Sequence, residues 1–158
     1  MKRIFSINHN FLLLQSMETT IKIIIVDDHP LIRGAVQQLL SSNSQFRVID
    51  VCEDGGQAIE AVKQLKPDVV IMDIDMKPIN GFDATETICK EVPAVKVIGY
   101  SNNDEVVYAK KMFQLGAKGF VTKGSRSEEL VTAIFSVYAG QEFVCDEIQN
   151  KMNSYRQS

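Results

Sequence analysis

The stretch from Ile21 to Pro30 reads Ile-Lys-Ile-Ile-Ile-Val-Asp-Asp-His-Pro, and the organisation of the chain can be worked out from it. Five of its first six residues are β-branched, which is typical of a buried strand, here ending at Val26. Pro30 stands where the first residue of a helix is expected, and apolar residues follow it at spacings of three and four. The pattern therefore predicts a strand that leads directly into an amphipathic helix.

The same alternation of strand and helix patterns continues along the chain. Further strands are predicted at Arg47–Cys52, Val69–Met72, Val95–Tyr100 and Gly119–Thr122, with helix-period stretches between and after them. Strands that are apolar on both faces need a helical layer on each side, and parallel sheets with helical crossovers provide it. We therefore expect an α/β fold with a doubly wound, five-stranded parallel sheet.

Length and composition limit the classes of function. A chain of 158 residues favours one domain. Lys and Arg number 17 against 20 Asp and Glu, a net charge of −3 that does not favour binding to nucleic acid or to an anionic membrane. The three cysteines are widely spaced and form no disulfide framework, which fits a cytoplasmic protein. No apolar run is long enough for a membrane helix or a secretory signal.

The patterned region sets the expected domain boundaries. We expect the folded domain to span residues 21–148, because the strand and helix patterns fall within it. Residues 1–20 are expected to be a flexible N-terminal extension, with Met17 as an alternative start, and residues 149–158 a C-terminal tail or the start of a linker.

Polar side chains stand where the predicted strands end. The first strand ends in Asp27 and Asp28, the third in Asp73, the fourth in Ser101 and the fifth in Lys123. Sheets of this kind place their chemistry at the carboxyl ends of the strands. We therefore expect three carboxylates, a hydroxyl and an ammonium group to meet at one edge of the sheet.

This set of side chains points to phosphoryl transfer. Three carboxylates close together need a compensating cation, and oxygen ligands without His or Cys suit Mg²⁺ or Mn²⁺. Beside such an ion, Asp73 can act as a nucleophile toward phosphorus and form an aspartyl phosphate. Lys123 and Ser101 would hold the other phosphoryl oxygens.

The motifs resemble the response regulator receiver domain of two-component signalling. They are, in chain order, Val26-Asp-Asp-His-Pro30, Met72-Asp-Ile-Asp-Met76, Gly99-Tyr-Ser101 and Gly116-Ala-Lys-Gly-Phe-Val-Thr-Lys123. The resemblance implies a flavodoxin-like (CheY-like) fold with strand order 2-1-3-4-5 and helices on both faces of the sheet. The opening Asp-His-Pro and the segment Ala139-Gly-Gln-Glu-Phe143 are similar to receivers of the NarL/FixJ group, which precede a LuxR-type helix-turn-helix.

The resemblance also implies roles for individual residues. The implied Mg²⁺ ligands are Asp28, Asp73 and the backbone carbonyl of Asp75, with Asp27 acting through water. Asp73 is implied to receive phosphate from a histidine kinase or a phosphotransfer protein, with Lys123 and Ser101 completing the catalytic set. Ser101 and Phe120 are implied to form the switch.

The resemblance further implies how the signal leaves the domain. The surface formed by the fourth helix, fifth strand and fifth helix is implied to change on phosphorylation, which allows a phosphorylation-dependent homodimer. DNA is expected as a partner only through an output domain outside these 158 residues. The implied protein is a signalling domain rather than an enzyme, apart from its own phosphorylation and dephosphorylation, and no membrane contact is expected.

The sequence departs from the family pattern in two places. Lys77 delays the expected proline to Pro78, so we expect a reshaped loop after the third strand. Phe120 takes a place often held by Tyr, which removes a hydroxyl group. Asp75 and Asn103 occupy the two variable positions that tune dephosphorylation in the family, and we expect them to set the phosphoryl lifetime.

Other classes of function remain open at this point. Asp73 and Asp75 resemble the Asp-x-Asp segment of haloacid dehalogenase-like phosphatases, in which the first Asp is the nucleophile and the second an acid or base. A binding module that keeps the receiver fold without phosphorylation is a further alternative. Flavin binding fits less well, because the acidic Asp27-Asp28 pair would repel a phosphate group.

Overall fold

The structure is a computed structural model that describes residues 19–157. Within these residues, six strands form one sheet in the order β2-β1-β3-β4-β5-β6, and all the pairings are parallel. The strands are β1 (Ile21–Val26), β2 (Phe46–Cys52), β3 (Val69–Met72), β4 (Lys96–Ser101), β5 (Gly119–Thr122) and β6 (Phe143–Val144). The helices are α2 (Pro30–Ser41), α3 (Gly55–Leu65), α4 (Gly81–Glu91), α5 (Val106–Gln114), α6 (Ser127–Tyr138) and α7 (Asp146–Arg156).

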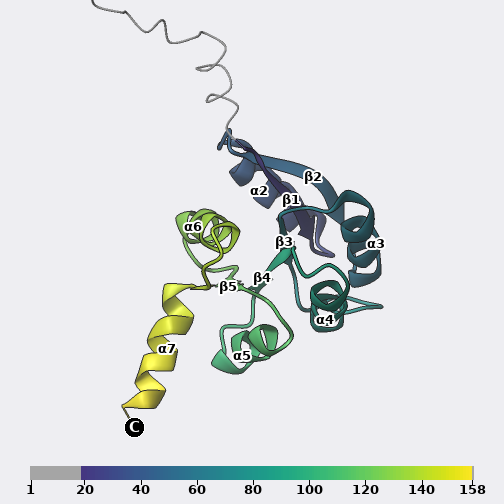
Figure 1. The fold of residues 1–158 in the computed structure, drawn as a ribbon. Coiled ribbons are helices and arrows are strands. Elements are labelled where there is room, and N and C mark those ends of the chain that lie inside the picture. Colours follow the sequence, from purple (N-terminus) through teal and green to yellow (C-terminus); the bar gives the residue numbers. More distant parts are fainter. Residues whose placement is uncertain (1–18, 158) are drawn as a thin grey trace, which may run out of the picture.

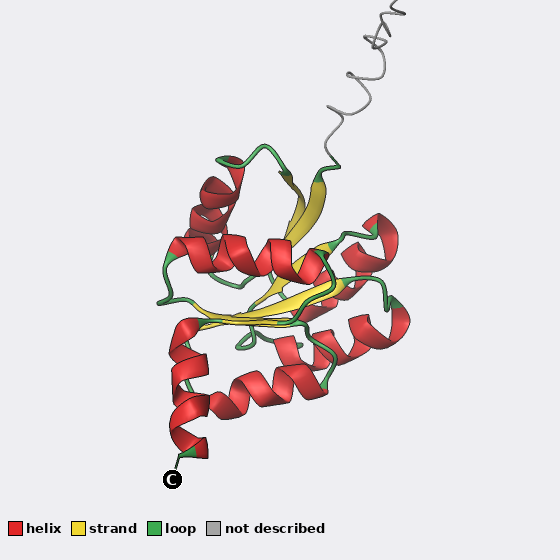
Figure 2. Ribbon diagram, turned by 60° about the vertical axis from the view of Figure 1, so that its left-hand side comes forward, coloured by secondary structure: helices red, strands yellow, loops and turns green. Residues whose placement is uncertain are grey.

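The helices form a layer on each face of the sheet. Helices α2 and α6 cover one face, and α3, α4 and α5 cover the other (Figure 1). Figure 2 shows the strands enclosed between these two layers. The predicted doubly wound, flavodoxin-like fold and the order 2-1-3-4-5 of its first five strands are confirmed.

The structure adds a strand and a helix to the prediction. Strand β6 contains two residues, Phe143 and Val144, which pair with Gly119 and Phe120 of β5. Helix α7 follows directly and runs to Arg156, through residues expected to be a tail or the start of a linker. Two residues are too short a run to carry a strand pattern, and the predicted sheet therefore has five strands instead of six.

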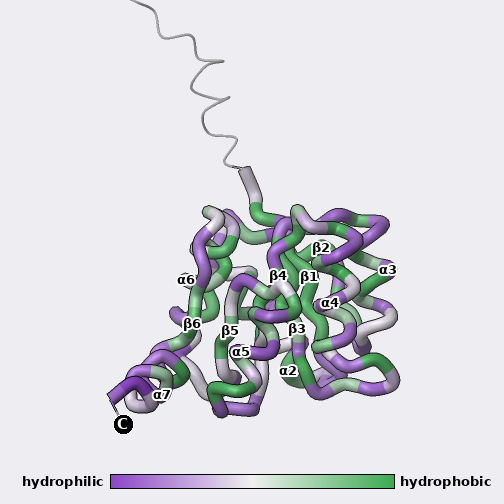
Figure 3. The backbone as a smooth tube through the Cα atoms, turned by 60° about the horizontal axis from the view of Figure 1, so that its bottom comes forward, coloured by the Kyte–Doolittle hydropathy of each residue, from purple (hydrophilic) through white to green (hydrophobic). Residues whose placement is uncertain are grey.

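Local sequence explains where the elements begin and what they bury. The side chain of Asp54 accepts hydrogen bonds from Gly56 N and Gln57 N and so caps α3, and Asn80 caps α4 in the same way. Strands β1 and β3 are almost wholly buried because helices cover both of their faces. Figure 3 shows the central strands as hydrophobic and α7 as largely hydrophilic.

The register of the sheet brings the strand ends together. Val26 of β1 pairs with Met72 of β3, and Met72 pairs with Gly99 of β4. Ser101 of β4 pairs with Thr122 of β5. The residues that follow β1, β3 and β5 therefore emerge at the same edge, next to the end of β4.

The remaining expectations concern the termini and membranes. Most of the expected N-terminal extension, residues 1–18, lies outside the described residues, as does Met17. None of the helices within residues 19–157 is long and apolar enough to cross a membrane. Cys52, Cys89 and Cys145 are free thiols.

Candidate functional site

The acidic pair after β1 has one buried and one half-exposed member. Asp27 is only 2% exposed, and its Oδ1 accepts a hydrogen bond from the backbone N–H of His29 at 2.8 Å. The side chain of Asp28 is 38% exposed, and its Oδ1 lies 2.8 Å from Nδ1 of His29. The first carboxylate thus faces the interior of the site, and the second faces its opening.

Lys123 joins the ends of β1 and β3. Its Nζ lies 2.6 Å from Oδ2 of Asp27 and 3.4 Å from Oδ1 of Asp73. Asp73 is 3% exposed and the Lys123 side chain 5%, so these charges meet away from bulk solvent. A buried ion pair of this kind is held by close geometry, because each charge loses its hydration.

Burial changes the protonation of both groups. Burial raises the pKa of Asp73 to about 6, and the negative charge of Asp27 adds to the rise, while the Lys123 ammonium opposes it. For Lys123, burial alone would lower the pKa, but the hydrogen bond to Asp27 and the charge of Asp73 outweigh it and raise the pKa. Lys123 is therefore a cation at neutral pH, whereas the Asp73 carboxyl titrates at about pH 6.

The clustered carboxylates of the site could hold a cation. One ligand atom from each of Asp27, Asp28, His29 and Asp73 lies within 4.8 Å of the others. Oδ2 of Asp73 is buried and has no hydrogen-bond partner among the described residues. Three carboxylates against one lysine leave negative charge in the site, and carboxylate oxygens are the ligands that Mg²⁺ prefers. The donor set therefore fits a small divalent cation.

Ser101 is the last residue of β4 and Phe120 lies in β5, and both are fully buried. The backbone N–H of Lys123 donates to the carbonyl of Ser101 at 2.8 Å, which holds the ends of β4 and β5 together. Oγ of Ser101 accepts a hydrogen bond from the N–H of Asn103, so it orders the loop after β4 and does not cap α5. The ring of Phe120 already lies inside, against Gly99, where an added Cβ would come within 2.8 Å of the ring.

The loop after β3 forms the mouth of the site. Asp28, Asp75, Lys77, Pro78 and Phe82 are among the residues that line an open cavity of about 940 Å³. The Lys77–Pro78 peptide bond, where the proline is delayed by one position, is cis. The side chain of Asp75 turns toward the next loop, and its Oδ2 accepts a hydrogen bond from Nδ2 of Asn103 at 2.7 Å.

The structure places the predicted residues in one neighbourhood and adds others. Arg33 Nη1 donates to the backbone carbonyl of Asp27 at 2.7 Å, which fixes the end of β1. An added Cβ on Gly81 would overlap the carbonyl of Asp73, so only glycine allows α4 to begin this close to the end of β3. Arg33 belongs to no recognisable motif, so its contact could not be predicted. Gly81 directly follows the cap residue Asn80, and this pair of residues is a sequence signal for a tight helix start.

Comparison with protein families gives one family for most of the chain. A model described as the response regulator receiver domain matches residues 23–135. The match includes all of the acidic residues, the lysine and the serine described above.

Curated relatives agree with this match. Response regulator GacA of Pseudomonas aeruginosa is 34% identical over 132 residues, which cover 84% of this chain and 62% of the relative. Transcriptional regulatory protein DegU of Brevibacillus brevis is 34% identical over 143 residues, or 90% of this chain and 61% of the relative. The chain thus spans less than two thirds of the length of these relatives.

Solved structures show the same fold. A two-component response regulator of the LuxR family from Aurantimonas sp. SI85-9A1 is similar with a TM-score of 0.85 and 30% identity, covering 88% of this chain and 99% of that one. The receiver domain of the putative response regulator NarL from Mycobacterium tuberculosis gives a TM-score of 0.74 and 30% identity, covering 77% of this chain and 98% of that one.

Proposed function

Since the chain belongs to the response regulator receiver domain family, we propose that Asp73 accepts a phosphoryl group from a histidine kinase or a phosphotransfer protein. The observation that carries the proposal is the state of Asp73. Its Oδ2 is buried without a hydrogen-bond partner among the described residues, while Oδ1 faces the Lys123 ammonium. One oxygen is available to a cation or to phosphorus, and the other is held in place.

We propose Mg²⁺, with Mn²⁺ as a substitute, as the cofactor of this site. Asp28, Asp73 and the backbone carbonyl of Asp75 would hold the ion, and Asp27 would act through water. The cluster of ligand atoms at the strand ends supports this assignment. When bound, the ion supplies positive charge against the phosphoryl oxygens.

The chain's own residues then have distinct parts in the transfer. A carboxylate oxygen of Asp73 attacks phosphorus, the new O–P bond forms, and the P–N bond of the donor phosphohistidine breaks, so that the electron pair leaves with the imidazole nitrogen. Lys123 neutralises an oxygen of the transferred group and moves away from Asp27 as it does so. The Ser101 hydroxyl donates to another phosphoryl oxygen, and Phe120 repacks beside it to complete the switch.

The lifetime of the phosphoryl group depends on access of water to Asp73. Asp75 and Asn103 are hydrogen-bonded to each other across the mouth of the site. We propose that this pair sets the rate of hydrolysis, as expected from their positions.

The relatives, rather than the site, suggest which kind of output domain the receiver controls. The curated relatives extend well beyond their matched residues, and one is named a transcriptional regulatory protein. We propose a cytoplasmic regulator with a LuxR-type DNA-binding output outside these 158 residues and a phosphorylation-dependent homodimer. DNA contact would come only through that output domain.

Labelling with acetyl phosphate and Mg²⁺ tests the phosphoacceptor role. Intact-mass spectrometry should show one phosphoryl group per chain, and Asp73→Asn should remove it. Asp83→Asn, which changes an exposed carboxylate on α4, is the matched control and should label normally.

A second substrate, para-nitrophenyl phosphate, separates a switch from a phosphatase. Stoichiometric labelling without sustained hydrolysis of para-nitrophenyl phosphate agrees with a receiver. Sustained turnover that depends on Asp73 and Asp75 would favour the phosphatase instead, and full labelling of Asp73→Asn would refute the assignment of the acceptor.

A further inference from the structure

Helix α7 crosses from the end of β5 toward α5, beside the elements that hold the phosphoacceptor site. Figure 1 shows it starting next to β5 and running away from the sheet. Strand β6 positions the start of α7 next to β5, because Cys145 N donates to the carbonyl of Phe120 at 3.0 Å immediately before the helix begins. The C-terminal helix is thus fastened to β5, the strand that directly precedes Lys123.

Two polar side chains of α7 contact the last residue of β5 and the loop that follows β4. Oε2 of Glu147 accepts a hydrogen bond from Oγ1 of Thr122 at 2.9 Å, and Thr122 directly precedes Lys123. One turn later, Nζ of Lys151 lies 2.8 Å from Oδ2 of Asp104 and donates to the Asp104 carbonyl at 2.8 Å. Asp104 belongs to the loop that Ser101 orders. Helix α7 therefore contacts both the residue before Lys123 and the loop after Ser101.

A third contact ties the start of α7 to α6. Oε1 of Glu129, which is itself buried, accepts a hydrogen bond from the N–H of Asp146 at 2.7 Å. A carboxylate at this position also stabilises the first turn of the helix through the helix dipole. The N-terminal half of α7 is therefore anchored on α6, β5 and the loop before α5.

Helix α7 buries little apolar surface. Ile148 is the only buried residue of the helix, and Met152 packs at the edge of the core. An open groove separates its C-terminal half from α5, lined by Val106, Val107 and Tyr155, among others. Because most helices are held by packing of an apolar face, a helix with one buried residue depends on its polar anchors, and small movements of these anchors can decide whether it stays docked.

We propose that α7 is a latch that is docked while Lys123 binds Asp27 and is released when Asp73 is phosphorylated, an inference that rests on the proposed function. Drawing Lys123 and Ser101 toward a phosphoryl group moves Thr122 and Asp104, and the two bridging contacts of α7 cannot both follow. Release uncovers the surface formed by α5, β5 and α6.

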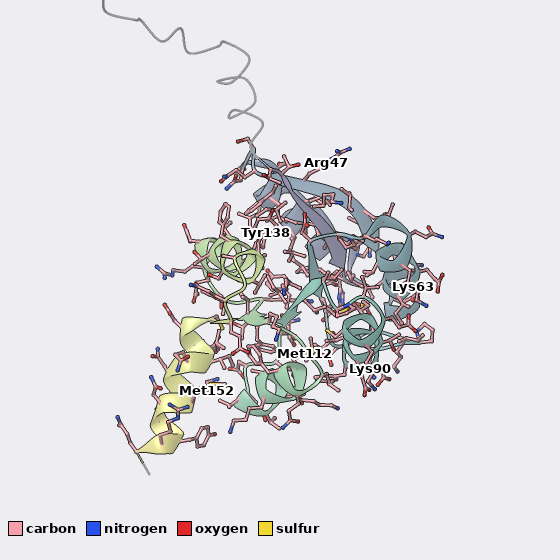
Figure 4. All side chains as sticks on the ribbon, viewed as in Figure 1. Arg47, Lys63, Lys90, Met112, Tyr138 and Met152 are labelled. Atoms are coloured by element: carbon pink, nitrogen blue, oxygen red, sulfur yellow. The ribbon has the colours of Figure 1, made fainter. Side chains whose placement is uncertain are left out.

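Coupling of this kind is reciprocal. If phosphorylation releases α7, then weakening the docking of α7 must favour the phosphorylated state. Lys151→Ala removes one bridging contact without touching the site. Lys90→Ala is the matched control, because Lys90 forms a similar surface ion pair with Glu86 on α4, away from α7 (Figure 4).

Hydrogen exchange of the full chain, with and without Mg²⁺ and beryllofluoride as a phosphoryl mimic, tests the latch. We expect amides of α7 to exchange at least about tenfold faster with the mimic, while amides of α3 do not change. Lys151→Ala should bind the mimic about threefold to tenfold more tightly than the wild type, and Lys90→Ala should bind it equally.

The alternatives give different results. Slower exchange around Asp73 and Lys123 together with unchanged or slower exchange in α7 would overturn the latch and leave the phosphoacceptor site intact. If Mg²⁺ and beryllofluoride change no segment of the chain, both the proposed function and the latch are wrong.

Discussion

Asp73 is buried close to the Lys123 ammonium and the Asp27 carboxylate, and the resulting pKa makes the stability of the protein depend on pH. Its pKa is raised to about 6 in the folded chain by burial and by Asp27. The ordinary value is 3.8, so the folded state holds a proton more tightly than the unfolded state between these values. Stability from this group is complete at low pH and is lost as the pH rises through about 6.

We predict that Asp73→Asn removes this dependence. In metal-free buffer the variant should be more stable than the wild type at pH 8 by up to about 3 kcal/mol, because a pKa difference of about two units corresponds to that free energy. The difference should shrink toward zero below about pH 4. Urea unfolding at both pH values measures it, and an equal difference at the two would contradict the prediction.

Single residues of the site were predictable where they followed strands. Asp27, Asp28, Asp73 and Lys123 meet as expected, because parallel strands end at one edge. The bond between Asp75 and Asn103 and the contact of Arg33 with the Asp27 carbonyl were not predictable, because they depend on side-chain rotamers and loop paths.

At the scale of elements, the start of α4 fixes the end of β3. We predict that Gly81→Ala destabilises the fold by about 3 kcal/mol, because the added Cβ overlaps the Asp73 carbonyl and overpacking of this kind forces the backbone apart. The variant should also lose labelling by acetyl phosphate, since Asp73 moves with its backbone.

A second glycine provides the control. Gly34 lies inside α2 with nothing within 4 Å of an added Cβ. Gly34→Ala should raise stability by about 0.5–1 kcal/mol through helix propensity. Thermal unfolding of both variants checks the pair, and equal effects would mean that close packing at Gly81 does not matter.

The elements that the sequence predicted were those with a clear period. Apolar runs indicated β1 to β5, and apolar residues at helical spacing indicated α2, α3 and α6. Helix α7 consists mainly of charged and amide side chains and buries only Ile148, so no apolar period marks it in the sequence. The folded domain was expected to span residues 21–148, and the helix continues beyond this range to Arg156. Contacts with β5 and α6, rather than its own pattern, explain where it lies.

At the scale of the whole molecule, a cation that binds only the folded site should stabilise the entire chain. We predict that Mg²⁺ raises the free energy of unfolding by about 2.7 kcal/mol at a hundredfold excess over its dissociation constant. Chelation should reverse the effect, and Asp28→Ala should lose most of it. Thermal unfolding with and without Mg²⁺ measures this, and an equal gain in Asp28→Ala would place the ion elsewhere.

The central claim is that residues from four different strand ends form one Mg²⁺-dependent phosphoacceptor pocket. A crystal structure of the chain with Mg²⁺ and beryllofluoride tests it most directly. We predict density for beryllofluoride on Asp73, within reach of Lys123 Nζ and Ser101 Oγ, and a metal ion bound by Asp28, Asp73 and the carbonyl of Asp75. Beryllofluoride or metal bound at other residues, or a Lys123 side chain directed out of the pocket, would contradict the account.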